Sequence, residues 1–302
     1  MVDKISVQGI DSNWLKKHGI HRFSHKAMAT VFEIFIDHDN YSYALQAATE
    51  SFAQLDLLEL ELSRFVENSD ISRINQLKPG ESTIVGAESM ECLTICQRLQ
   101  VESNGTFNPT VGKVIDYWKN NSESEICINE KIGNLILDSK SYTVTLTDNI
   151  ISIDLGGIGK GYALDKLKST FQEWDIKNIL INSGRSTLLA MEPPKNEIGW
   201  PLIISHPSHK NELKRIFLNN SAIAGSGVEK GDHIVSPSNY QPIQNKLCAW
   251  SMARTGAEAD ALSTSFMIMS EGEILDYIKH HPDVGGMIFN EEGSLMKYGT
   301  LK

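Results

Sequence analysis

Residues 153–165 (IDLGGIGKGYALD) carry the clearest chemical signal in the sequence. Four glycines surround Lys160, a strand ending at Asp154 precedes them, and an amphipathic helix follows. Glycines at a strand-to-helix turn let the backbone approach a ligand closely, and the start of the helix offers unpaired N–H groups to an anion. The segment therefore predicts a phosphate site. The alternative is a plain glycine-rich turn with a solvated lysine.

Two known nucleotide motifs do not match this segment. A P-loop requires Gly at the position of Asp154 and Ser or Thr at that of Gly161. A dinucleotide fingerprint fails because Gly157, Gly159 and Gly161 are followed by Tyr162 where it requires Gly. The sequence thus predicts another kind of phosphate site.

A second segment, 258–265 (EADALSTS), suits a divalent cation. Asp260 and Thr264 are four residues apart near the start of an expected helix, so one carboxylate and one hydroxyl share a face. Mg²⁺ prefers oxygen ligands and takes one or two protein carboxylates, with substrate phosphates and waters completing its shell. The alternative is a helix-capping acid beside a half-buried threonine.

A third segment, 222–237 (AIAGSGVEKGDHIVSP), places His233 on an expected short strand after a Gly and Ser turn. Histidine is the usual proton acceptor near neutral pH. Eight other histidines compete with it, and a lone histidine is more often structural. Gly225-Ser226-Gly227 does not match GxSxG, so no nucleophile elbow is expected.

Composition limits the classes of partner. The 302 residues, 41% of them hydrophobic and 22% charged, are ordinary for a globular protein. A net charge of −10 argues against nucleic-acid binding, which needs clustered Lys and Arg. Apolar runs are too short to insert into a membrane. Four cysteines in a chain of this length favour a reducing compartment, so we expect a cytoplasmic protein as the sequence stands, or a periplasmic one if a leader precedes it.

The elements follow from hydrophobic periodicity and turn residues. We expect a strand at 28–37, a long helix at 41–62, a helix at 87–101, and a hairpin at 141–154 turning at Asp148-Asn149. Further strands are expected at 178–182, 200–205, 215–218, 247–253, 286–290 and 294–298, and helices at 259–269 and 273–280. This pattern is α+β. We expect an N-terminal extension, 1–22, and one domain, 23–302, whose two halves could be related by duplication.

Taken in order, the motifs resemble the ApbE family of FAD:protein FMN transferases. They are KAMAT (26–30), LSRFVENSDISRIN (62–75), GTFNPTVGKVIDYW (105–118), IDLGGIGKGYALD (153–165), INSG (181–184), the strand region 200–207, AIAGSG (222–227), HIVSP (233–237) and ADALST (259–264). The resemblance implies a T-fold-like α+β architecture of mixed or antiparallel sheets packed by helices.

The resemblance also implies roles for particular residues. The positions that match those contacting FAD are Met28, Phe65, Thr106, Phe107, Asn108, Asp154, Lys160 and Ile234. Those that match the Mg²⁺ site are Gly157, through its carbonyl, and Asp260, Ser263 and Thr264. His233 matches the general base.

The implied reaction joins the FMN half of FAD to a Thr or Ser hydroxyl of an acceptor protein and releases AMP, with Mg²⁺ at the pyrophosphate. Several positions depart from the family pattern: Phe65 replaces Tyr, Asn108 replaces Asp, Gly225 replaces Thr, Ser236 and Tyr240 replace Asp and Gly, and Arg185 interrupts a GGD. These departures lie on the flavin and acceptor side. Two alternatives therefore stay open, an FAD pyrophosphatase that uses water and a flavin-binding module without catalysis. Mg²⁺ is not distinguished from Mn²⁺.

Overall fold

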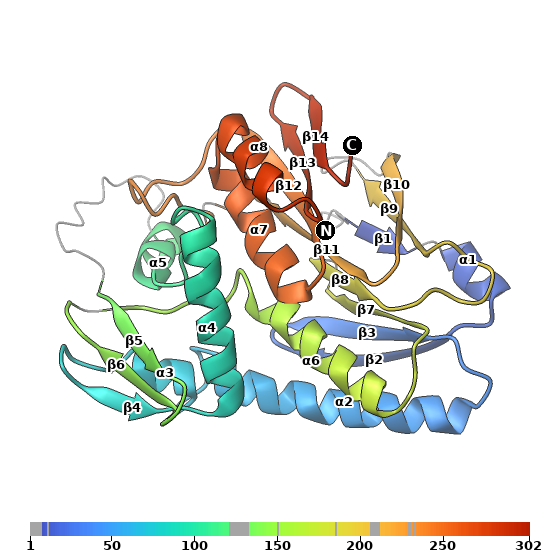
Figure 1. The fold of residues 1–302 in the computed structure, drawn as a ribbon, viewed down its shortest axis with the longest axis horizontal. Coiled ribbons are helices and arrows are strands. Elements are labelled where there is room, and N and C mark those ends of the chain that lie inside the picture. Colours follow the sequence, from blue (N-terminus) through green and yellow to red (C-terminus); the bar gives the residue numbers. More distant parts are fainter. Residues whose placement is uncertain are drawn as a thin grey trace.

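An eight-stranded antiparallel sheet forms the centre of the molecule (Figure 1). The computed structural model describes residues 8–10, 12–120, 133–149, 151–184, 186–205, 212–228, 231 and 233–302. In sheet order the strands are β14 (Leu295–Gly299), β13 (Gly285–Asn290), β12 (Lys246–Ala253), β11 (Ser221–Gly227), β8 (Thr187–Ala190), β7 (Ile179–Ser183), β3 (Thr30–Ile36) and β2 (His21–Ala27).

Three helices cover one face of this sheet: α2 (Tyr41–Leu62), α6 (Gly159–Glu173) and α7 (Gly256–Ile268). Strand β3 shows why both faces are covered. Its Phe32 and Ile34 point into the larger core beneath the helices, whereas Phe35 points into a second core on the opposite face. Alternation with period two places successive side chains on opposite faces, so apolar residues at both parities require two covering layers.

The second layer consists of a three-stranded antiparallel sheet, β1 (Gln8–Ile10), β9 (Trp200–Ser205) and β10 (Glu212–Leu218), together with α1 (Ser12–Lys17). Trp200 of β9 and Trp250 of β12 are fully buried in the core between this layer and the main sheet, and the ring of Trp14 lies 5.5 Å from that of Trp200. The described residues of the N-terminal stretch thus pack as part of this layer.

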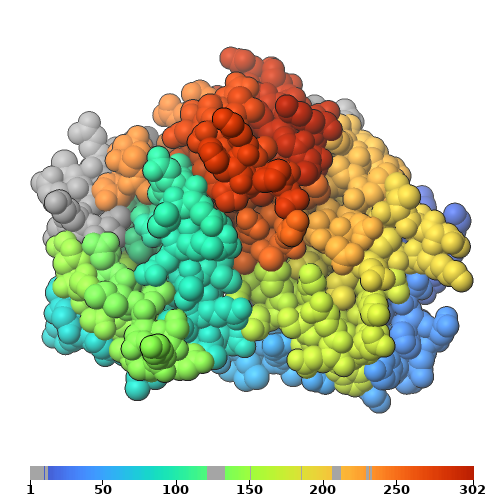
Figure 2. Space-filling model, in the orientation of Figure 1, coloured from blue at the N-terminus to red at the C-terminus, as the bar shows by residue number. Residues whose placement is uncertain are grey.

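A smaller lobe lies beside the helices (Figure 1). It contains α3 (Asp70–Ile74), α4 (Ala87–Glu102), α5 (Gly112–Asn120) and the sheet formed by β4 (Ser82–Ile84), β6 (Thr143–Leu146) and β5 (Leu135–Asp138). Figure 2 shows α4 at the surface between this sheet and the C-terminal region, which includes α8 (Glu271–His280). None of the described helices combines the length and apolar character that a bilayer span requires.

The long helices and most strands lie where the sequence predicts them, but two local predictions are wrong. The expected hairpin over 141–154 is absent from the described residues there, because β6 pairs with β4 and β5 instead. Ile151 and Ile153 are buried in the main core, and the side chain of Asn75 bonds both backbone groups of Ile153. Residues 233–237 form one isolated bridge, Val235 to Pro242, and not the expected strand.

Candidate active site

The site is built where the first turns of α6 and α7 cross. A Cβ on Gly161 would overlap the carbonyl oxygen of Gly256, and one on Gly256 would overlap the carbonyl of Gly161. The two helix starts therefore touch backbone to backbone. Gly161 is required by this helix contact, whereas the glycine-rich pattern predicts close approach of a ligand.

Asp165 fixes the second helix to the first. Its carboxylate accepts hydrogen bonds from the backbone N–H groups of Gly256 (2.7 Å) and Ala257 (2.8 Å) at the start of α7. Burial raises the pKa of this carboxyl group to about 6, because desolvation outweighs the effect of the two hydrogen bonds. The position of α7 thus depends on a side chain ninety-one residues away in the sequence.

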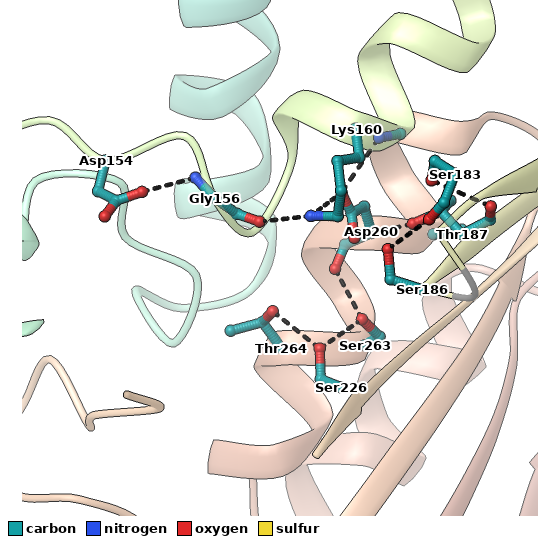
Figure 3. Close-up of polar contacts among 12 residues, drawn as sticks. Asp154, Gly156, Lys160, Ser183, Ser186, Thr187, Ser226, Asp260, Ser263 and Thr264 are labelled. Atoms are coloured by element: carbon teal, nitrogen blue, oxygen red, sulfur yellow. Dashed lines mark hydrogen bonds and ion pairs between the residues drawn. The ribbon is translucent and has the colours of Figure 1, made fainter. Parts of the chain in front are cut away.

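Asp260 lies one turn into α7 and points toward the start of α6 (Figure 3). It is 4% exposed. Its Oδ2 accepts from the N–H of Gly161 at 3.1 Å, and its Oδ1 accepts from the hydroxyl of Thr187 at 3.0 Å. Three elements, α6, α7 and β8, therefore hold one buried carboxylate in a fixed orientation.

Lys160 places a positive charge beside that carboxylate. Its Nζ donates to the carbonyl oxygen of Gly156 at 2.8 Å and lies 3.6 Å from Oδ2 of Asp260 (Figure 3). Helix α6 is preceded by Ile158, whose side chain cannot accept a hydrogen bond from the first turn. The ammonium group and the N-terminal end of α6 together favour an anion at this turn.

Hydroxyl groups occupy the next turn of α7. Thr264 is half-buried, and its Oγ1 would lie 3.3 Å from a Cβ on Gly157. Ser263 is fully buried and donates to the carbonyl oxygen of Asp260 at 2.8 Å. Ser226 of β11 lies 2.8 Å from the hydroxyl of Ser263 and 3.2 Å from that of Thr264.

The oxygen atoms at this crossing suit a hard divalent cation. Asp260 and Thr264 supply a carboxylate and a hydroxyl oxygen beside the turn at Gly157, which is the ligand chemistry that Mg²⁺ prefers. Each carboxylate oxygen of Asp260 has one recorded hydrogen bond and two lone pairs, so acceptor capacity remains. Within the described residues, no group of three His, Cys, Asp or Glu side chains could hold a metal. The described residues therefore contain no metal site built from histidine or cysteine side chains.

Arg64 connects the lobe to the glycine-rich turn. Its guanidinium makes two hydrogen bonds to Asp116 of α5, at 2.7 and 2.5 Å, and its Nε lies 3.0 Å from Oδ2 of Asp154. These bonds raise the pKa of Arg64 and lower that of Asp116. The ring of Phe65 lies 4.6 Å from the guanidinium and is 79% exposed, so it presents an aromatic face to solvent.

The turn between β2 and β3 is strained. Met28 and Ala29 have φ angles of +49° and +57°, and Ala27 pairs with Thr30 across them. Two-residue hairpin turns with positive φ favour Asn and Gly, and other residues cost roughly 1–2 kcal/mol each in this region. Thr30 also packs on Gly184, where a Cβ would overlap its hydroxyl. Strain of this kind is common at ligand sites.

Residues 106–108 follow the end of α4. The hydroxyl of Thr106 donates to the carbonyl of Ser103 at 2.9 Å, and Phe107 is buried close to Gly157. The amide oxygen of Asn108 accepts from both the N–H and the hydroxyl of Thr110. Beside Asn108 a cavity of about 280 Å³ opens between α4, β5 and residues 237–240.

Comparison with known proteins identifies the family to which this protein belongs. A family model described as the ApbE family matches residues 28–288. The chain belongs to the ApbE family. Curated relatives named FAD:protein FMN transferase include one from Haemophilus influenzae, 25% identical over 84% of this chain and 82% of the relative, and one from Escherichia coli K12, 22% identical over 89% and 84%.

Solved structures share the fold. An ApbE protein from Thermotoga maritima superposes with a TM-score of 0.79 at 22% identity, covering 93% of this chain and 97% of that one. The flavin transferase ApbE from Vibrio cholerae gives the same TM-score and coverage at 19% identity. The α+β class with antiparallel sheets and packed helices, predicted from the sequence, is confirmed.

The structure brings most of the positions implied by the ApbE resemblance into two connected groups. Asp260, Ser263 and Thr264 lie with Lys160 and Gly157 at the α6–α7 crossing. Phe65 and Asp154 meet at Arg64.

Of the remaining positions, Phe107 lies close to Gly157 of the first group. Met28 occupies the strained turn, and the side chain of Ile234 is buried in the main core. Arg185 lies outside the described residues.

His233 lies on the connection after β11. Its Nδ1 is 2.8 Å from the carbonyl oxygen of Gly231. A carbonyl oxygen can only accept, so we assign the proton of the neutral ring to Nδ1 and the basic lone pair to Nε2. The half-buried ring is thus oriented with one nitrogen in the form a proton acceptor needs.

Four residues of the site were not predicted from the sequence: Arg64, Asp165, Thr187 and Ser226. Three of them carried weak signals. Arg64, Asp165 and Ser226 stand inside motifs that were quoted for the family resemblance, but nothing local indicates their partners. Thr187 carried no signal, because a threonine in a buried strand is unexceptional.

Proposed function

We propose that this chain transfers the FMN part of FAD to a Ser or Thr hydroxyl of an acceptor protein and releases AMP, with Mg²⁺ as the required cation. The observation that carries the proposal is the buried carboxylate of Asp260, held 3.6 Å from the ammonium of Lys160 at the start of α6. The names of the curated relatives support the same activity.

The pyrophosphate of FAD would lie at this crossing. The protein has a net charge of −10, so a dianionic ligand must be held by local groups against the long-range field. Lys160 and the positive end of the α6 dipole are such groups. Asp260, Thr264 and the carbonyl of Gly157 would hold Mg²⁺, which supplies neutralisation of the charge that develops on the phosphates.

The flavin would lie toward the lobe. Phe65 offers an exposed ring backed by the guanidinium of Arg64, and Met28 lies in the strained turn of the main sheet. Stacking on Phe65 does not require the phenol hydroxyl that a tyrosine would add. Asp154, held by Arg64, and residues 106–108 would contact the same ligand from the lobe side.

The transfer step needs one proton acceptor. Nε2 of His233 would take the proton of the acceptor hydroxyl as its oxygen forms a bond to the phosphorus of the FMN half. The bond from that phosphorus to the bridging oxygen breaks, and AMP leaves with the electron pair. Positioning and electrostatic stabilisation supply most of the acceleration in such reactions.

The test is incubation with FAD, Mg²⁺ and candidate acceptor proteins, followed by in-gel flavin fluorescence and an AMP assay. We expect a fluorescent acceptor band and an equal amount of AMP. Asp260→Asn should abolish both, whereas Asp276→Asn, an exposed carboxylate on α8, should not. AMP without a labelled acceptor would indicate an FAD pyrophosphatase instead. FAD binding without AMP would indicate a module without catalysis.

A further inference from the structure

Ser226 joins the two hydroxyl residues of α7 into one hydrogen-bonded chain (Figure 3). Its Oγ lies 2.8 Å from Oγ of Ser263 and 3.2 Å from Oγ1 of Thr264. The chain ends at the backbone carbonyl oxygen of Asp260, 2.8 Å from Oγ of Ser263. No role for Ser226 follows from the expected FAD and Mg²⁺ contacts.

The carbonyl oxygen of Asp260 determines which hydroxyl group donates in each of these hydrogen bonds. A carbonyl oxygen only accepts, so Ser263 must donate its single proton to Asp260. The bond between Ser263 and Ser226 must then use the proton of Ser226. The contact between Ser226 and Thr264 is left to the proton of Thr264.

The hydroxyl of Thr264 therefore directs its proton toward Ser226 and keeps its lone pairs for another partner. That oxygen also lies against Gly157, on the side where the turn and Asp260 meet. A hydroxyl that binds a cation must present a lone pair and give its proton to an acceptor elsewhere. The series of hydrogen bonds through Ser226 and Ser263 satisfies both requirements for Thr264.

We infer that Ser226 is a positioning residue that orients the hydroxyl of Thr264 toward the cation. Ser263 is fully buried and donates its proton to the carbonyl oxygen of Asp260. It therefore belongs to this series of hydrogen bonds and is not a ligand of the cation. The inference rests on the proposed function, since it concerns the same cation.

The fold supports a rigid role for Ser226. Ser226 pairs with Ala249 of β12, and α7 packs directly on β11 and β12. A hydroxyl on a strand that is paired with β12 and covered by α7 has few ways to move, and precise placement of a ligand requires support of this kind. Ser226 can therefore hold Thr264 in one orientation.

The test measures Mn²⁺ affinity directly. The full-length protein with saturating FAD and no acceptor is titrated with Mn²⁺, and the free ion is followed by its EPR signal. We expect Ser226→Ala to raise the Mn²⁺ dissociation constant about 10- to 100-fold, the usual effect of losing a partner of a metal ligand. FAD affinity without metal and the unfolding midpoint should stay near wild type. Ser265→Ala is the matched control, because this buried serine of α7 bonds the carbonyl of Ala261 and lies outside the chain.

A double-mutant cycle separates positioning from a general structural effect. Thr264→Val removes the hydroxyl that Ser226 orients, so adding Ser226→Ala to it should weaken Mn²⁺ binding no further. Equal loss in both backgrounds, or no loss from Ser226→Ala alone, would overturn the inference while leaving the proposed function intact. If the wild-type protein with FAD binds no Mn²⁺, both the role of Ser226 and the proposed function are wrong.

Discussion

Replacing Gly161 by Ala tests whether the backbone contact between α6 and α7 builds the site. The new methyl group would overlap the carbonyl of Gly256 and lie 2.8 Å from Cβ of Asp260, so the helices must separate. Overpacking of this kind costs about 1–3 kcal/mol. Separation also breaks the bond from the N–H of Gly161 to Asp260, worth about 1.5–3 kcal/mol for a charged acceptor. The higher helix propensity of alanine relative to glycine stabilises the folded variant by about 1 kcal/mol. We expect a net loss of about 1.5–5 kcal/mol.

The assay is equilibrium unfolding in urea, compared with Gly272→Ala. Gly272 lies in the first turn of α8, it is exposed, and a Cβ there meets nothing within 4 Å. That control should lose no stability and gain up to about 1 kcal/mol. If Gly161→Ala unfolds at the same urea concentration as the control, the contact does not constrain the helices and the construction of the site is wrong.

Three further predictions follow from single residues. His233→Ala should slow acceptor labelling about 10²- to 10⁴-fold, the usual contribution of a general base, with FAD affinity nearly unchanged; loss of FAD binding would instead make His233 a binding residue. Phe65→Ala should weaken FAD binding by about 0.5–1.5 kcal/mol, measured by flavin fluorescence, while Phe65→Tyr should not; equal affinities in all three proteins would remove Phe65 from the flavin site. Because burial raises the pKa of Asp165 to about 6 from 3.8, the folded state binds a proton between these values and the unfolded state does not, so this group adds about 2 kcal/mol of stability as pH falls from about 6 to 4. Asp165→Asn should lack that rise when free energies of unfolding are compared across this range, and a variant with the wild-type profile would contradict the assignment.

Periodic segments were predictable from the sequence because their pattern is local. The helices at 41–62 and 273–280 each repeat apolar residues on one face, and the structure has α2 and α8 there. That Asp260 and the turn containing Gly157 share one cation is implied by the resemblance to a family and not by periodicity, and it stays a prediction.

The parts that failed depend on contacts between distant segments. Residues 150–154 alternate like a strand, yet Ile151 and Ile153 are drawn into the main core and Asn75 takes the backbone bonds of Ile153. Glycine has the same sequence signature whether it admits a ligand or a second helix, so the role of Gly161 could not be assigned. The partner of Asp165 lies at the start of α7, and no local pattern indicates it.

The location of the cation is the most direct test of the account. A crystal of the full-length protein with FAD and Mn²⁺, measured at a wavelength where manganese scatters anomalously, would show the ion as a peak in the anomalous difference map. We predict one strong peak between the carboxylate of Asp260 and the hydroxyl of Thr264, in contact with the FAD pyrophosphate. A bound FAD whose pyrophosphate lies away from the α6–α7 crossing, with the manganese peak elsewhere, would contradict the central claim.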